Sequence, residues 1–210
     1  MKTQNPKVFC IGLQRTGTTS LHSALEILGY RSVHGAFAMF PDPSQDVLDQ
    51  YDAFSDNPIP LLYQALDKRC PGSKFILTTR DIEGWLRSVK WLFTTGRIEG
   101  NWQADPIIDH VHAALYGASD YDESQFRRTW QEYHDEVSLY FSDRSQDLLM
   151  LDLALDNKWE ALCRFLNAEI PEVDFPSSNK SSVLRTLIAP AKHLVKRLIG
   201  WRLTDHNMKQ

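Results

Sequence analysis

The sequence lacks the features of a disulfide-bonded, a zinc-binding or a membrane-spanning protein. Its 210 residues include three cysteines, which are far apart and show no Cys-x-x-Cys or Cys/His spacing (Cys10, Cys70 and Cys163). No stretch approaches about 18 consecutive apolar residues, and residues 1–6 contain no apolar segment of the kind that secretory signals carry. We therefore expect a reduced, cytoplasmic protein that requires no metal.

Positive charge is also scarce over most of the chain. The net charge is −4, but residues 180–210 hold seven Lys or Arg against one acidic residue, Asp205, so residues 1–179 carry −10. An acidic body argues against a nucleic-acid partner. An anion-binding site in this body has to be built locally, from a few cations and backbone N–H groups.

What the sequence does contain is an alternation of apolar strands and amphipathic helices. Aromatic residues make up 11% of it, which is typical of a folded chain, and its length suits one α/β domain. This alternation predicts a central, mainly parallel sheet flanked by helices. Strands are predicted at residues 8–11, 30–34, 53–56, 74–79 and 147–153, the last as a buried strand. Helices are predicted at about 18–28, 58–70, 81–92, 104–116, 123–142 and 159–166, with an irregular stretch at 35–51.

The first predicted strand leads into a loop with the spacing of a phosphate-binding motif. Gly12 and Gly17 match the two glycines of G-x-x-x-x-G-K-[ST], and an amphipathic helix follows directly. The lysine of the motif is absent, because Thr18 stands in its place and the cation inside the loop is Arg15. A nucleoside triphosphatase uses that lysine on the β- and γ-phosphates, so its absence disfavours such an enzyme.

The residues of this loop suit an anionic phosphoryl or sulfonyl group held without a metal. Backbone N–H groups at a helix N-terminus attract anions, and the fork of an arginine matches two oxygens better than the point charge of a lysine. The structural alternative is a decayed loop that serves only as a turn. The predicted binding residues of the loop are Gly12, Arg15, Thr16, Gly17, Thr18, Thr19 and Ser20.

Polar residues stand at the ends of other predicted strands as well. Asp56 ends the strand at 53–56, Arg80 follows the strand at 74–79, and Ser88 lies two helical turns beyond Arg80. In an open parallel sheet, ligands bind beyond the carboxyl ends of the strands. We therefore expect Arg80 and Ser88 to converge on one anion at the same edge as Arg15.

Together, the loop and the Arg80–Ser88 pair resemble the sulfotransferases that use 3′-phosphoadenosine 5′-phosphosulfate (PAPS). In that family a [KR]-[ST]-G-T-T-[SWA] loop holds the 5′-phosphosulfate, which residues 15–20 match, and Arg80 and Ser88 match its 3′-phosphate pair. The resemblance extends from about residue 7 to residue 88. It implies a P-loop-type three-layer fold, PAPS as donor, 3′-phosphoadenosine 5′-phosphate (PAP) as product, and no metal.

The resemblance also implies an in-line transfer to a hydroxyl or amine of a small-molecule, lipid or carbohydrate acceptor. Arg15 stands where the family has a catalytic lysine, and a guanidinium there stabilises charge without giving up a proton. The acceptor needs a general base. Asp56 occupies a place comparable to that of the family's base, and His34 is the second candidate. Each has a structural alternative: Asp56 as the cap of the helix that Pro58 begins, and His34 as a satisfied packing residue.

The acceptor pocket is predicted from the least regular parts of the chain, residues 35–51 and 97–122. Their side chains indicate an apolar or aromatic acceptor (Phe37, Met39, Phe40, Trp102 and Tyr116). Trp85 is a candidate for the adenine contact, because the tryptophan that cytosolic relatives place after Gly-Thr-Thr is Ser20 here.

The end of the chain has a different character. Residues 182–202 predict a helical segment with one apolar and one basic face, split near Pro190. The predicted organisation is therefore a sulfotransferase-like P-loop domain at 1–180 and a basic amphipathic helical extension at 181–210. Such a helix docks on its own domain, on a second copy in a homodimer, or on an anionic membrane surface, and the first two are favoured.

Two other functions fit parts of the sequence. A P-loop nucleotide or small-molecule kinase would use Asp152, which follows an apolar run, as a magnesium ligand. A non-catalytic module would keep the nucleotide-binding loop and recruit partners through the basic C-terminal helix.

Overall fold

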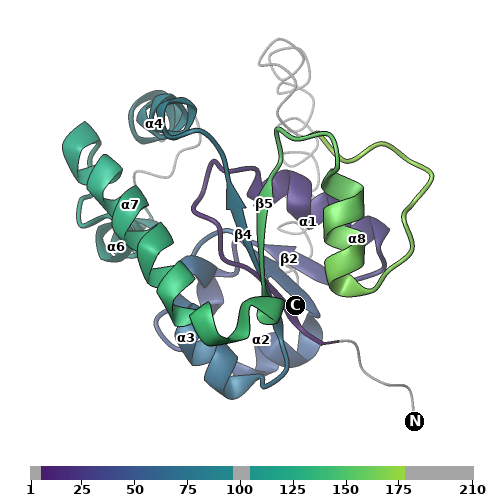
Figure 1. Ribbon diagram of the computed structural model, residues 1–210. Helices are drawn as coiled ribbons and strands as arrows, with labels where there is room; N and C mark the ends of the chain where they lie inside the picture. Colours follow the sequence, from purple (N-terminus) through teal and green to yellow (C-terminus); the bar gives the residue numbers. More distant parts are fainter. Residues whose placement is uncertain (1–5, 97–104, 178–210) are drawn as a thin grey trace, which may run out of the picture. The chain divides into compact units, whose positions relative to one another are not determined.

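The computed structural model describes residues 6–96 and 105–177 (Figure 1). The chain divides between Pro176 and Ser177, and the described helices and strands all belong to the unit that ends at Pro176. Trp102 and the predicted helix at 182–202 lie outside the described residues, so their predicted roles stay predictions.

Five parallel strands form one sheet in the order β2-β3-β1-β4-β5. Their bounds are β1 Val8–Cys10, β2 Ser32–His34, β3 Ala53–Ser55, β4 Lys74–Thr79 and β5 Leu148–Asp152. The chain leaves β1 toward one edge of the sheet and β4 toward the other. In such a sheet the ligand crevice opens beyond the carboxyl ends of these two adjacent strands.

Helices cover both faces of the sheet and complete a three-layer α/β fold (Figure 1). Alternate residues of β1 point to opposite faces: Phe9 joins a core with α3, α4, α6 and α7, whereas Val8 and Cys10 join a core with α1 and α8. The central strand is therefore buried on both sides. The helices are α1 Thr18–Ile27, α2 Gln45–Gln50, α3 Ile59–Arg69, α4 Ile82–Trp91, α6 Pro106–Tyr116, α7 Glu123–Tyr140 and α8 Lys158–Leu166.

The helices begin in two ways: carboxylates cap three of those described, whereas α1, α2, α3 and α8 have no side-chain cap. Carboxylates cap α4, α6 and α7, where Asp81, Asp105 and Asp122 each accept a backbone N–H of the first turn. No side chain caps α1, which starts after Gly17 and has no acidic residue in its first turn. The positive end of α1 is thus left for an anion from outside the helix.

Two predictions about secondary structure need correction. β5 is not a buried strand: it lies at the edge of the sheet, and the side chain of Met150 is 53% exposed. Leu149 and Leu151 pack on one face, whereas the other face at Met150 is left uncovered. Residues 35–51 are more regular than predicted, because they contain the 3₁₀ turn Phe37–Met39 and helix α2.

Among residues 6–96 and 105–177, no helix combines the length and the apolar character needed to cross a membrane.

The close packing of Gly12 on β4 yields a stability prediction. A Cβ on Gly12 would overlap the Thr78 hydroxyl and lie 2.7 Å from the Thr78 backbone nitrogen. We expect Gly12→Ala to lower the free energy of unfolding by about 2 kcal/mol or more, because β4 cannot move away without breaking the sheet. Urea titration measures the change.

Gly29→Ala is the control. A Cβ there meets nothing within 4 Å, and the cost is limited to the left-handed φ of 87°, about 1 kcal/mol. If Gly12→Ala lowers the free energy of unfolding no more than Gly29→Ala does, the loop does not depend on close contact with β4.

Candidate functional site

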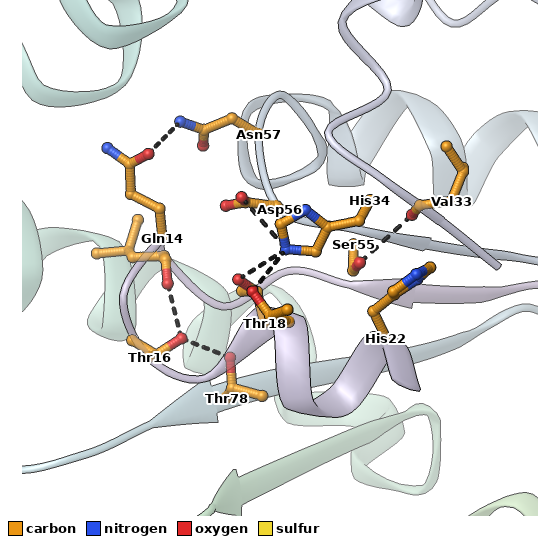
Figure 2. A network of polar contacts seen from close by, with 12 residues as sticks. Gln14, Thr16, Thr18, His22, Val33, His34, Ser55, Asp56, Asn57 and Thr78 are labelled. Carbon is orange, nitrogen blue, oxygen red and sulfur yellow. Dashed lines mark hydrogen bonds and ion pairs between the residues drawn. The ribbon is translucent and has the colours of Figure 1, made fainter. Parts of the chain in front are cut away.

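Thr16 makes hydrogen bonds inside the loop between β1 and α1 and so stabilises its conformation. Its N–H and its hydroxyl both donate to the Leu13 carbonyl, at 3.2 and 2.6 Å, and the hydroxyl also lies 2.5 Å from that of Thr78 (Figure 2). Thr16 is buried. Its hydroxyl is therefore committed to the turn and to β4, and its predicted contact with a donor anion stays a prediction.

The structure brings together the three predicted anion-binding residues that lie far apart in the sequence. The Arg15 Nε donates to the Ser88 hydroxyl at 2.9 Å, and Arg80 Nη1 lies 3.3 Å from the Arg15 carbonyl oxygen. Arg15 has a left-handed φ of 71°, and its guanidinium lies 5.4 Å from the centre of the Trp91 ring. Two guanidinium groups and a hydroxyl thus border the loop and the uncapped end of α1.

Gly84 lies close to both the Asp81 carboxylate and the end of the Arg80 side chain. A Cβ on Gly84 would lie 3.0 Å from Arg80 Nη2 and also meet the Asp81 carboxylate, which accepts the Gly84 N–H at 2.5 Å. Asp81 thereby caps α4 while Arg80 turns toward the loop.

The two candidate bases lie in contact with each other. His34 Nε2 is 3.4 Å from Asp56 Oδ2, 3.4 Å from the Thr18 hydroxyl and 3.2 Å from the Thr19 hydroxyl (Figure 2). Their strands, β2 and β3, pair in register and end side by side, which brings the two residues together. The pair therefore adjoins the first turn of α1.

Asp56 does not act as a helix cap. No side chain caps α3, and the Asp56 backbone carbonyl, not its carboxylate, accepts the Ile59 N–H at 3.0 Å. The carboxylate is held against His34 with a left-handed φ of 67°, and its Oδ1 is buried without a hydrogen-bond partner. The capping alternative for Asp56 is therefore wrong.

Burial raises the pKa of the Asp56 carboxyl above its usual value. The charges of His34 and Arg15 and the N–H of Asn57 act in the opposite direction but do not outweigh the loss of hydration. The Asp56 carboxyl therefore lies against the His34 ring and holds a proton more readily than an exposed carboxyl does. Such a pair suits proton transfer better than an exposed, fully ionised carboxylate.

A second histidine packs behind His34. The ring of His22 lies 5.6 Å from that of His34, its Nδ1 is 2.8 Å from the Ser32 hydroxyl, and its Nε2 is 3.6 Å from Glu26. Burial lowers the pKa of His22. No sequence motif marks His22, and its i, i+4 spacing with Glu26 is the local signal of an interaction.

A buried amide network connects the loop to the turn after β3. Asn57 Nδ2 donates to Gln14 Oε1 at 3.1 Å, and Gln14 Nε2 is 3.2 Å from His112 Nε2 (Figure 2 for Gln14 and Asn57). His112 faces inward, whereas His110 is exposed and contacts the ring of Phe40, so the two lie on different faces of α6. No sequence motif marked Gln14, Asn57 or His112 as site residues.

Some predicted pocket residues prove to be core residues. Met39 and Tyr116 are fully buried, whereas Phe37 and Phe40 are half-buried. Trp85 is fully buried and donates to the Gln14 carbonyl at 3.0 Å, so it is unable to stack on an adenine. The aromatic side chain that α4 exposes beside Arg15 is Trp91, which is 42% exposed.

The described residues also bear on the metal-dependent alternative. Among residues 6–96 and 105–177, no group of three or more His, Cys, Asp or Glu side chains could hold a metal ion. Asp152 lies at the end of β5, but its Oδ1 accepts the Ala154 N–H at 2.8 Å and so stabilises the following turn.

Comparison with known proteins gives two findings. A family model described as a sulfotransferase domain matches residues 7–47 and 41–184. The chain is also 26% identical over 206 residues to Ava biosynthesis cluster protein M of Aspergillus versicolor, with 81% of this chain and 79% of that protein covered.

The raised pKa of Asp56 predicts how stability depends on pH. Its carboxylate destabilises the fold above the folded-state pKa, and the penalty disappears below the unfolded value, near pH 4. Asp56→Asn should therefore raise Tm at pH 7, on the order of 2 °C, with no gain at about pH 4. Thermal unfolding followed by circular dichroism measures both.

Asp52→Asn is the matched control, because Asp52 has the same side-chain exposure of 22%. Its ion pair with Arg31 lowers the pKa of Asp52. Its replacement should lower Tm at pH 7, and this loss should fade as the pH falls. If Asp56→Asn lowers Tm at pH 7 as well, the buried Asp56 carboxylate is not destabilising.

Proposed function

The chain belongs to the sulfotransferase domain family, and we propose that it transfers a sulfuryl group from PAPS to a hydroxyl or amine of a small acceptor. The observation that carries this proposal is the convergence of Arg15, Ser88 and Arg80 beside the uncapped end of α1. These groups offer positive charge and hydrogen-bond donors at the carboxyl ends of β1 and β4, where an open α/β sheet binds its ligand.

The proposed donor site uses separate groups for the two ends of PAPS. The first-turn N–H groups of α1, with the hydroxyls of Thr18 and Thr19, would hold the 5′-phosphosulfate. Arg80 and Ser88 would bind the 3′-phosphate, for which a guanidinium and a hydroxyl are suitable donors. Gly12 and Gly17 allow the backbone to approach, and Ser20 completes the first turn.

The transfer reaction requires charge stabilisation, proton acceptance and positioning from the chain's residues. Arg15 would stabilise the negative charge that develops on the oxygen joining sulfur to PAP as that bond breaks. The acceptor oxygen or nitrogen forms the new bond to sulfur, and its proton passes to the Asp56–His34 pair. The α1 N-terminus, which adjoins Arg15 and the Asp56–His34 pair, would hold the sulfuryl group in line between the leaving oxygen and the acceptor.

The acceptor is proposed to be apolar or aromatic. Trp91 presents an exposed ring beside Arg15, and Phe37 and Phe40 are half-buried on the segment after β2. Contact of residues 182–202 with a second copy or with a membrane surface stays a prediction.

Arginine variants separate the proposed roles. Arg15→Ala should lower kcat on the order of 10²- to 10³-fold with PAP affinity changed little, because its contribution is made in the transition state. Arg80→Ala should weaken PAP binding about 10- to 100-fold, since it removes a charge-assisted contact. Isothermal titration calorimetry with PAP and transfer of labelled sulfate from PAPS to an acceptor panel measure these effects.

Arg87→Ala is the control, since Arg87 is exposed on α4 directly before Ser88. It should leave both quantities within about twofold, as expected of an exposed charge. Wild-type protein should bind PAP without metal. A preference for Mg·ATP over PAP would instead support a kinase, and PAP binding without transfer to any acceptor would support a non-catalytic module.

A further inference from the structure

Two residues with strained backbone carry proposed catalytic side chains. Among residues 6–96 and 105–177, three non-glycine residues have a positive φ: Arg15, Asp56 and Asn167. Asn167 ends α8, where a left-handed asparagine is common. Arg15 and Asp56 lie in loops after strands rather than at a helix end, and the contacts around them hold them in this conformation.

The chain neighbours of these two residues are bonded to each other. Gln14 precedes Arg15, Asn57 follows Asp56, and the two side-chain amides meet at 3.1 Å. Both are buried, with exposures of 7% and 1%. In Figure 2 the Gln14 and Asn57 amides face each other on one side of the site, and Asp56 points from the same turn toward His34.

Gln14 is also held from two further elements. Its side-chain amide nitrogen lies 3.2 Å from His112 Nε2 of α6, and its backbone carbonyl accepts the Trp85 indole N–H of α4 at 3.0 Å. Because hydrogen bonds are directional, the Asn57 and His112 contacts fix the orientation of the Gln14 side-chain amide, and the Trp85 contact fixes the Gln14 backbone. An apolar pair would fill the same space but would not specify one arrangement.

We propose that Gln14 and Asn57 form a clamp that sets the Arg15 loop against the Asp56 turn for sulfuryl transfer. The clamp rests on the proposed function, and both members are positioning residues because their burial keeps them from the substrates. It couples the group that stabilises the leaving oxygen to the pair that takes the acceptor's proton. In-line transfer is sensitive to shifts of about 1 Å between such groups.

Gln14→Leu and Asn57→Leu remove the hydrogen bond at nearly constant volume. Each should lower kcat on the order of 10²-fold with PAP affinity changed less than about threefold, because the donor contacts remain. The double variant should be no slower than the slower single variant, since both remove one interaction. Additive losses, an unchanged kcat, or parallel losses of PAP affinity would overturn the clamp.

Ser73→Ala is the stability control. Ser73 is buried and donates to the Cys70 carbonyl at 2.6 Å, at the start of β4 and away from the strand's carboxyl end. Ser73→Ala and the clamp variants should all lower Tm, because each removes a buried hydrogen bond, but Ser73→Ala should leave kcat unchanged. If Ser73→Ala slows transfer equally, the effect of the clamp variants is one of stability alone.

A structural measurement that does not depend on sulfate transfer tests the clamp separately from the proposed function. In a crystal structure of Gln14→Leu, the Arg15 loop should be displaced from the Asp56 turn, and the distance from His34 Nε2 to Asp56 Oδ2, 3.4 Å here, should change, because the amide contact no longer holds the two segments. An unchanged loop and an unchanged His34–Asp56 distance would overturn the clamp. A displaced loop in a protein whose wild type transfers no sulfate would support the clamp's geometry and overturn the proposed function.

Discussion

The contact between Gly12 and Thr78 is the constraint on which the arrangement of the site depends. β1 and β4 pair in register, and the Ile11 N–H continues the ladder with a 2.8 Å bond to the Ile76 carbonyl. The next residue must then pass directly over Thr78, which glycine alone allows. As a result the Arg15 loop and Arg80 leave the sheet at one point, and the two arginines lie in contact although 65 positions separate them.

The site accepts features that a fold optimised for stability would avoid. Arg15 and Asp56 adopt left-handed backbone, and one oxygen of the Asp56 carboxyl is buried without a hydrogen-bond partner. By contrast, the helices α4, α6 and α7 carry the carboxylate caps that favour a helix start. Local costs concentrated at one end of a sheet are typical of functional sites, and the two buried cores compensate for them.

The sequence predicts the parts of this arrangement that depend on local pattern. The order of strands and helices, the loop and the grouping of Arg15, Arg80 and Ser88 follow from periodicity and from the rule that parallel strands end at one edge. The burial of Trp85 is not predictable in this way, because it depends on packing against α6 and α7 rather than on the pattern of its own helix. The edge position of β5 likewise depends on which strands pair.

The Gln14–Asn57–His112 network was missed for the same reason. Its members lie 43 and 98 positions apart in the sequence, and none belongs to a local motif. The contact of His34 with Asp56 also requires the pairing of β2 with β3, which the sequence does not specify. From the sequence, His34 and Asp56 are alternative bases, whereas in the structure they lie in contact as one pair.

A crystal structure of the protein with PAP would test the proposed donor site. We expect the 5′-phosphate at the first turn of α1 and the 3′-phosphate within hydrogen-bond distance of Arg80 and Ser88, without a metal ion between the protein and the nucleotide. A nucleotide bound elsewhere, or one whose 3′-phosphate contacts neither Arg80 nor Ser88, would contradict it.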